Sequence, residues 1–165
     1  MNKLLCELGN MSILRKEALW MRRKIESIAY DDTLLFSPDF PINACKHASL
    51  LYCFHMRKKG FSGPLELVFG VSPMRASEVG HWWVESGSTL IDITADQFNL
   101  ISDNALSNKI KKKRQYLSVY CCPIEQAPHL KVFNTVSKER RAWNADEISE
   151  DYLENLEILY GRLSG

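Results

Sequence analysis

The chain has 165 residues, of which 45% are hydrophobic, and this composition predicts one folded domain over residues 1–165 rather than a disordered chain. Its formal net charge of +1 argues against a general electrostatic attraction to nucleic acid or to a membrane surface. No apolar run reaches the roughly 20 residues that a membrane-spanning helix needs, so no association with a membrane is expected.

Cysteine usage and the first residues indicate a compartment. Five cysteines are an odd number, and their spacing is not that of a small disulfide-stabilised scaffold, so reduced thiols are expected. Charged residues interrupt residues 1–7 too early for a secretory signal. We therefore expect a cytoplasmic protein.

The first predicted element is an amphipathic helix over residues 11–30. Apolar residues recur there at steps of three or four, at Leu14, Ala18, Met21, Ile25 and Ile28. A loop is expected next, over residues 31–41, because its prolines disfavour helix in the residues before them.

A second helix is predicted to begin beside a cysteine. Asn43 is a favourable N-cap, and an apolar stripe that follows it would end near Gly60. Cys45 then lies in the first helical turn, where the helix dipole and unpaired backbone N–H groups favour a thiolate and could also bind an oxyanion. An ordinary thiol, with a pKa of about 8.5, is little ionised near neutrality, so this placement would help make Cys45 a nucleophile.

A β-hairpin is predicted to bring a histidine and an aspartate together. A turn at residues 86–87 sets His81 directly opposite Asp92, whereas a turn at residues 87–88 sets His81 opposite Thr94. Directly opposed residues share a face, with Cβ atoms roughly 4.5 to 5.5 Å apart. In the first register, which we favour, the carboxylate would accept a hydrogen bond from one imidazole nitrogen and turn the other nitrogen toward a thiol.

Both registers predict the same two faces for the hairpin. Trp82 and Val84 share one face with Ile91 and Ile93, as a layer of the core would require. Trp83 points to the other face, so one of the two tryptophans is expected in the core and the other beside a cleft.

The other predicted elements are a strand at 65–71, a loop at 72–80, short helical pieces that could form a flap at 95–114, a strand at 116–121, and a helix that follows a capping box at Asn144 and Glu147 and runs to Gly161.

Three motifs in this region resemble those of known cysteine enzymes. They are Phe-Pro-x-x-x-Cys at 40–45, His-x-Trp-x-Glu at 81–85 and Ile-Asp-Ile-Thr-x-x-Gln-Phe at 91–98. The motifs resemble the core of the transglutaminase-like and papain-like cysteine enzymes, and more closely a group of poorly characterised bacterial proteins. The resemblance covers about a third of the chain.

The resemblance implies an α+β fold, in which the helix that bears the cysteine packs on a small antiparallel sheet. It implies Cys45 as nucleophile, His81 as general base and Asp92 as the residue that orients His81. The sequence departs from the family at residues 92–94, where many relatives have Asp-Pro-Thr, and at residues 43–46, where many carry glycine beside the cysteine.

Three further side chains are expected to support this site. The Cys45 backbone N–H would hold the oxyanion, with Asn43 as a second donor. Asp96 and Gln97 are close enough to Asp92 in the chain to contact and support the triad residues. Asp96 is also an alternative candidate for the residue that orients His81.

The expected function is that of a cysteine hydrolase or acyltransferase that acts on an amide. The amide could be a peptide bond, a glutamine carboxamide or a small amide, so the substrate could be a protein. No metal or organic cofactor is implied, and no particular oligomeric state is predicted. The alternative is a non-catalytic binding or regulatory module on the same scaffold.

Two other patterns in the sequence are weaker evidence for a function. A zinc site is not expected, because two of the candidate ligands lie on one helix more than a full turn apart; the candidates are Cys45, His47, Cys53, His55, Cys121, Cys122 and His129. The basic residues 109–114 resemble a nucleic-acid patch, but acidic residues at 146–157 balance them and no aromatic array accompanies them. They are therefore expected to form a solvated loop, without nucleic acid as a partner.

Overall fold

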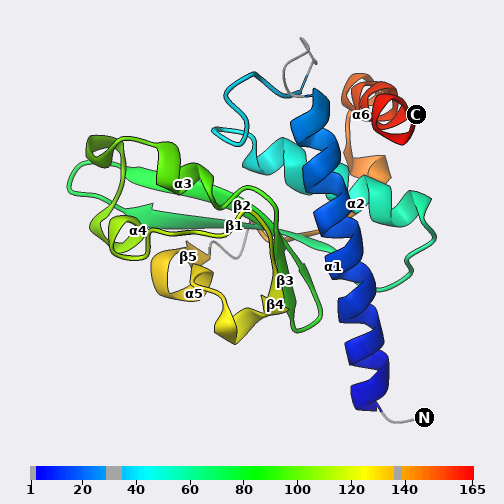
Figure 1. Cartoon of the computed structure of the whole chain (residues 1–165), viewed down its shortest axis with the longest axis horizontal. Helices are drawn as coiled ribbons and strands as arrows, with labels where there is room; N and C mark the ends of the chain where they lie inside the picture. The colour runs from blue at the N-terminus through cyan, green and yellow to red at the C-terminus, as the bar shows by residue number, and fades with distance from the viewer. Residues whose placement is uncertain (1–2, 29–34, 136–138) are drawn as a thin grey trace.

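The computed structural model describes residues 3–28, 35–135 and 139–165, with side chains from residue 9 onward (Figure 1). In chain order its elements are α1 (Lys3–Ile28), α2 (Cys45–Lys58), β1 (Glu66–Pro73), β2 (Glu78–Ser86), β3 (Thr89–Asp92), α3 (Gln97–Leu100), η1 (Asp103–Ala105), α4 (Asn108–Lys112), β4 (Tyr120–Pro123), η2 (Ile124–Gln126), α5 (His129–Val132), β5 (Asn134–Thr135), β6 (Arg141–Ala142), η4 (Ala145–Glu147) and α6 (Glu150–Ser164). The prediction of an α+β fold with a small antiparallel sheet is confirmed. None of the described helices is both long and apolar enough to cross a lipid bilayer.

The sheet lies between two hydrophobic cores. Its strands are antiparallel, in the order β4-β3-β2-β1-β5, and β6 also pairs with β1. On one face α1, α2 and α6 pack over Leu67, Val84 and Ile91. On the other face the segments around α3, α4 and α5 enclose Trp83 and Phe98. Figure 1 shows α1 and α2 crossing on one side of the sheet, away from α4 and α5.

α1 carries the predicted apolar stripe. Its buried positions are each at most 1% exposed: Leu14, Ala18, Met21 and Ile25. The helix begins at Lys3, earlier than predicted, and its last described residue is Ile28. Of the loop predicted at 31–41, residues 31–34 lie outside the described residues, and residues 37–41 contain a series of turns as expected.

α2 begins one residue later than the predicted cap would place it. Its N-cap is Ala44, which makes no side-chain capping bond, so the prediction of Asn43 as N-cap is wrong. Asn43 instead takes a left-handed conformation with φ of 58°, which asparagine tolerates better than most residues, and so continues a turn that leads into the helix. Cys45 is the first residue of α2, which confirms its predicted place in the first turn. The helix ends at Lys58, close to Gly60 as expected.

The hairpin adopts the alternative register. Ser86 pairs with Thr89, so Gly87 and Ser88 form the turn, and the preferred prediction of a turn at 86–87 is wrong. Gly87 has φ of +58°, and a two-residue turn with glycine in its first position is one of the favoured hairpin turns. His81 is therefore not directly opposite Asp92.

The predicted faces of the hairpin are confirmed. Val84, Ile91 and Ile93 are buried in the core that α1 and α2 cover, and Trp82 packs partly against the same core. Trp83 is fully buried on the other face.

A glycine on the neighbouring strand makes room for the Trp83 ring. Gly70 pairs with His81 across β1 and β2. A Cβ atom on Gly70 would lie 2.6 Å from the Trp83 ring and 2.8 Å from Phe133. Glycine at this position therefore lets a tryptophan pack beside the histidine.

The remaining predicted elements are present in the structure, but their boundaries differ from the predicted ones. Residues 95–114 contain the short helices α3, η1 and α4 as expected. The strand predicted at 116–121 is β4, which begins at Tyr120, and the loop predicted at 72–80 is shortened because β1 and β2 extend into it. The Asn144 side chain caps η4 by accepting a bond from Asp146, so α6 begins later than predicted.

Candidate active site

The candidate nucleophile is Cys45, at the start of α2. The residue is partly exposed, and the His81 ring and the Trp82 backbone lie close enough to its thiol to lower the pKa of the thiol. Both partners belong to β2, against which α2 packs. The fold therefore brings together a thiol and an imidazole that are far apart in the sequence.

His81 links this thiol to the predicted carboxylate. The ring is fully buried, and its Nε2 atom lies 2.6 Å from Oδ2 of Asp92. Because Nε2 engages Asp92, Nδ1 is the ring nitrogen that can face the Cys45 thiol, and it also lies 3.2 Å from Nε2 of Gln97. The altered register does not prevent this contact, since a diagonal neighbour across two strands is still within reach of a long side chain.

Asp92 is held by four hydrogen bonds. Its Oδ1 atom accepts bonds from the backbone N–H and the hydroxyl of Thr94, at 2.8 and 3.1 Å. This is the local pattern by which aspartate bonds to the backbone two residues further on. Oδ2 receives the His81 bond and a second bond, at 2.8 Å, from Nε2 of His129. The turn thus orients the carboxylate toward two imidazoles.

The electrostatics favour a thiolate beside an imidazolium. Burial alone would raise the pKa of Asp92, but the charge of His81 and the hydrogen bonds from both histidines hold that pKa well below its usual value. Burial opposes the charged form of His81, yet Asp92 and Cys45 raise its pKa to about 10. Burial likewise opposes the Cys45 thiolate, but its bonds with His81 and the Trp82 backbone leave the pKa of Cys45 below that of an ordinary thiol.

His129 is a member of this cluster that the sequence did not reveal. It begins α5, is 1% exposed, and its Nδ1 atom has no hydrogen-bond partner among the described residues. Burial lowers its pKa despite the bond to Asp92, so the ring is neutral and donates from Nε2. A lone histidine after a proline carries no spacing signal that connects it with Asp92.

Gln97 connects the loop before the nucleophile to the imidazole. Its side chain is buried, its Nε2 atom lies 3.2 Å from Nδ1 of His81, and its Oε1 atom accepts a bond from the Asn43 backbone at 3.2 Å. Gln97 therefore contacts the triad, in line with its predicted supporting role. The Asn43 N–H is already engaged by Gln97, which argues against Asn43 as an oxyanion donor.

Asp96 has a different role from the one expected. Both of its carboxylate oxygens accept bonds from the Arg22 guanidinium, at 2.7 Å each. Arg22 is 6% exposed and also donates to the Ile93 carbonyl at 2.7 Å. Asp96 thus ties α1 to the connection between β3 and α3, and the substitute orienting role does not fit this geometry.

One group of described residues has the composition of a metal site. The potential ligand atoms of His81, Asp92 and His129 lie within 4.8 Å of one another. Two ligands of a tetrahedral zinc ion, each about 2.0 to 2.1 Å from the metal, lie roughly 3.3 Å apart. The observed separations of 2.6 and 2.8 Å from Oδ2 to the two Nε2 atoms are those of hydrogen bonds. The three residues therefore fit a proton-sharing cluster better than a metal site.

The other histidines considered as zinc ligands have different partners. His47 Nδ1 lies 2.6 Å from the Tyr152 hydroxyl, and His55 Nε2 lies 2.6 Å from Glu17. Cys53 is buried in the core. The geometry thus gives no support to a zinc site built from these residues, and the absence of metal remains a prediction.

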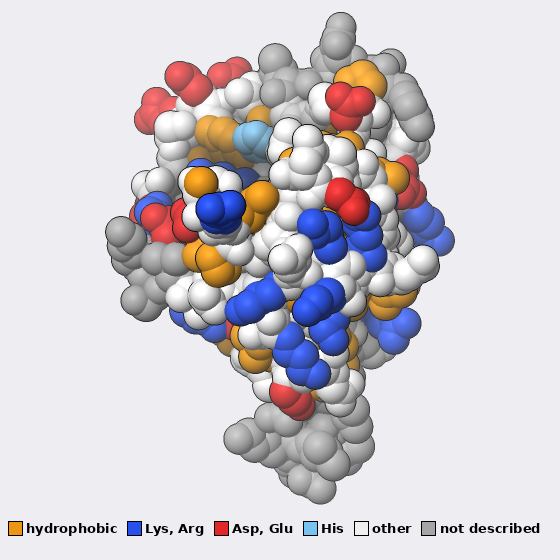
Figure 2. Space-filling model, turned by 90° about the vertical axis from the view of Figure 1, so that its left-hand side faces the viewer, with side chains coloured by type: hydrophobic (Ala, Val, Ile, Leu, Met, Phe, Trp, Pro, Cys, Tyr) orange, Lys and Arg blue, Asp and Glu red, His pale blue; other side chains and the backbone are white. Residues whose placement is uncertain are grey.

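The basic segment 109–114 was predicted as a solvated loop, but most of it belongs to the helix α4, and the rest follows that helix. Figure 2 looks onto the side where α3 and α4 lie in Figure 1, and Lys and Arg side chains gather on this face. Arg114 is engaged within the fold, because it contacts the Asp103 carboxylate and donates to the Phe98 carbonyl at 3.1 Å. Ile110 is buried beneath the helix.

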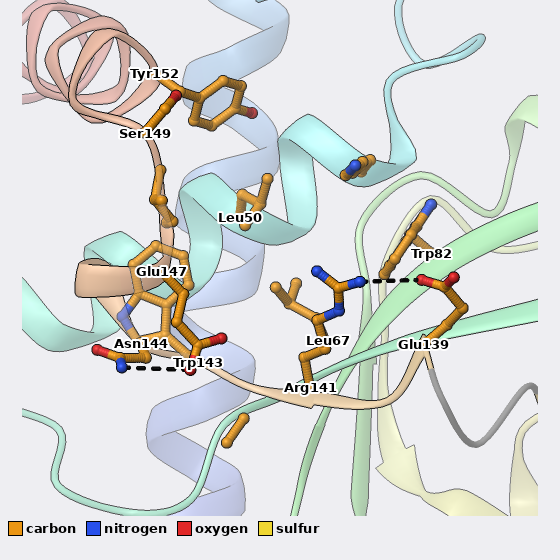
Figure 3. A pocket seen from close by; sticks show the side chains of 13 residues that line it. Leu50, Leu67, Trp82, Glu139, Arg141, Trp143, Asn144, Glu147, Ser149 and Tyr152 are labelled. Atoms are coloured by element: carbon orange, nitrogen blue, oxygen red, sulfur yellow. Dashed lines mark hydrogen bonds and ion pairs between the residues drawn. The ribbon is translucent and has the colours of Figure 1, made fainter.

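A pocket of about 260 Å³ lies between α2, the sheet and the segment that leads into α6 (Figure 3). Lys46 and Trp82, the residues that follow Cys45 and His81 in the chain, contribute to its wall. Trp82 is thus the tryptophan beside a cleft, and Trp83 is the one in the core. No family model, curated protein or solved structure matches the chain.

Proposed function

We propose that the protein is a cysteine hydrolase or acyltransferase of the transglutaminase-like and papain-like kind, and that it acts on an amide. The observation that carries this proposal is the contact of a partly exposed Cys45 thiol with a buried imidazole whose other nitrogen engages Asp92. A nucleophile, a base and an orienting carboxylate are the parts that such a reaction needs.

The reaction proceeds in two steps. The Cys45 thiolate attacks the carbonyl carbon, the C–N bond breaks, and the departing amine takes a proton from His81. The resulting thioester is then attacked by water or by an amine, which gives up a proton to His81 as Cys45 leaves. Water gives hydrolysis or deamidation, and an amine gives acyl transfer.

Gln97 is suited to help stabilise the oxyanion. When Nδ1 of His81 is unprotonated, it can accept a hydrogen bond from the Gln97 amide at 3.2 Å. A protonated Nδ1 cannot accept this bond, so the amide becomes available to a developing oxyanion beside the first-turn N–H groups of α2. The Gln97 amide would thus be free to bind the oxyanion when His81 is protonated and Cys45 is a thiolate.

Iodoacetamide labelling across pH tests the proposal. We expect Cys45 to react at a pH well below that at which an ordinary thiol reacts, because its pKa is lowered. Cys53 and Cys121 are internal controls, since burial raises the pKa of both thiols. His81→Ala should abolish the advantage of Cys45, whereas the matched variant His47→Ala should keep it.

The alternative is a binding or regulatory module without catalysis. In such a module Cys45 would label no faster at low pH than Cys122, the other partly exposed cysteine among the described residues, whose pKa burial raises. Equal labelling of these two cysteines would overturn the proposed enzyme. Faster labelling of Cys45 that His81→Ala removes would support it.

A further inference from the structure

The pocket is lined by Lys46 and Trp82, the residues next to Cys45 and His81 in the chain. The Trp82 backbone lies close enough to the Cys45 thiol to lower its pKa, and the Trp82 side chain lines the pocket. The Lys46 ammonium lies 5.3 Å from the centroid of the Trp82 ring. A group bonded to a carbonyl at Cys45 could therefore extend over Trp82 without leaving the protein surface.

Apolar and aromatic side chains form about half of the pocket wall, and charged and polar side chains form the rest. Figure 3 shows Leu50 on α2, Leu67 on β1 and Trp143 around a common space, which Trp82 and Tyr152 also line. Its volume of about 260 Å³ is below the roughly 300 to 1,000 Å³ of pockets that hold a whole drug-sized ligand. The pocket therefore suits one bulky apolar side chain of a larger substrate.

The charges on the rim include one ion pair and two groups, Glu147 and Lys46, without an oppositely charged partner among the described residues. Arg141 pairs with Glu139 at 3.7 Å, and Glu147 accepts a bond from Asn144 at 3.5 Å. Lys46 is exposed, and among the residues that the structure describes it has no carboxylate partner. Lys46 follows Cys45 in α2 and lines the pocket, so its ammonium could receive an anionic group of a ligand there.

We propose that this pocket binds the leaving group of the substrate, and that this group is an amino acid with a bulky apolar side chain and a free carboxylate. This inference rests on the proposed function. The side chain would occupy the pocket, and the carboxylate would meet Lys46 at its rim. The substrate class is an N-acylated amino acid or a peptide cleaved at its last residue.

The reaction at this subsite is a hydrolysis. Cys45 Sγ bonds to the acyl carbon, the C–N bond breaks, and the amino acid leaves with a proton from His81. Water then cleaves the thioester, releasing the carboxylic acid and restoring the thiol. No oxidant or reductant is needed.

Binding can be measured apart from chemistry in the full-length Cys45→Ser variant. Trp82 and Trp143 line the pocket, so tryptophan fluorescence should report a ligand there. We expect N-acetylphenylalanine to bind at least about tenfold more tightly than N-acetylalanine, because the aromatic ring fills the pocket. It should bind about two- to fivefold more tightly than N-acetylphenylalanine amide, which lacks the carboxylate that Lys46 would meet.

Two substitutions test which residue causes each binding preference, and each has a control substitution elsewhere in the protein. Trp143→Ala should remove the preference for phenylalanine, whereas Ile158→Ala, at an exposed position outside the pocket, should keep it. Lys46→Met should remove only the preference for the carboxylate, and it tests the inference even if Trp143→Ala fails to fold. Lys58→Met, at the other end of α2, should have no effect.

Equal binding of the three compounds, or no binding at millimolar concentration, would overturn the subsite. If this occurs while Cys45 still labels rapidly at low pH, the subsite alone is wrong. The expected binding preferences without enhanced labelling would support the pocket as a binding site and overturn the proposed enzyme.

Discussion

Nε2 of His129 lies 2.8 Å from Oδ2 of Asp92, the same carboxylate oxygen that engages the proposed general base. A neutral imidazole has one N–H, and His129 uses it here, which leaves its Nδ1 atom without a partner among the described residues. An unpartnered buried nitrogen costs free energy. The bond to Asp92 therefore has a benefit that outweighs this cost, and we infer that it keeps the carboxylate ionised and correctly oriented.

Replacing His129 should change how stability depends on pH. The pKa of His129 is lowered from 6.5 in the folded protein, so the unfolded chain binds a proton that the folded one does not as pH falls through about 6.5. The protein therefore loses stability on acidification in this range. His129→Asn, which can still donate to Asp92, should weaken that loss when urea unfolding is measured from pH 8 to 5. If the free energy of unfolding changes with pH equally in both proteins, His129 takes up a proton as readily in the folded protein as in the unfolded chain.

Asp92 should control the protonation of His81. The folded pKa of His81 is about 10, so its contribution to stability is complete below pH 6.5 and is lost as pH rises through about 10. Asp92→Asn removes the main charge that raises this pKa, and we expect the pKa to fall by at least one unit. NMR of the imidazole ring would measure it. Asp96→Asn is the matched control, and an equal effect of both variants would contradict the assignment of Asp92.

Gln97→Leu should separate oxyanion stabilisation from thiol activation. Alkylation by iodoacetamide forms no oxyanion, so the labelling rate of Cys45 should change little. Hydrolysis of N-acetylphenylalanine should slow by about 100-fold, the usual effect of removing one oxyanion donor. Gln126→Leu, at an exposed position, serves as the control. Equal losses in both reactions would mean that Gln97 acts only by positioning His81.

Arg22→Met should lower stability and leave the thiol chemistry largely intact. The substitution strands the Asp96 carboxylate and the Ile93 carbonyl, which Arg22 bonds at 2.7 Å each. Loss of one partner of such a largely buried pair costs about 3 kcal/mol in the free energy of unfolding. Arg23→Met, on the exposed face of the same helix, should cost less than about 0.5 kcal/mol in urea unfolding. A marked rise in the pH at which Cys45 labels would instead place Arg22 in the site.

Several parts of the fold and site could be predicted because they depend on short stretches of chain. The apolar stripe of α1 and the place of Cys45 in the first turn of α2 follow from helical spacing. The two faces of the hairpin follow from strict alternation, which a shift of the turn by one residue on each strand preserves. These features depend on backbone periodicity and on neighbours a few residues away.

Other local details were misjudged because two solutions compete over a short stretch. Asn43 can cap a helix or adopt a left-handed conformation, and the turn before α2 selects the second. The hairpin turn could begin at Ser86 or Gly87, and the backbone preference of glycine for positive φ favours the latter. Each choice shifts a boundary without changing the fold.

By itself, the sequence determined the spacing of the apolar residues, and with it the helix that presents Cys45 and the strands that carry His81 and Asp92. The tertiary structure alone decided that His129 would bond to Asp92 and that Arg22 would bind Asp96. The physical reason is that a hydrogen bond between side chains 37 or 74 residues apart depends on how whole helices and strands pack, and no local periodicity records that packing.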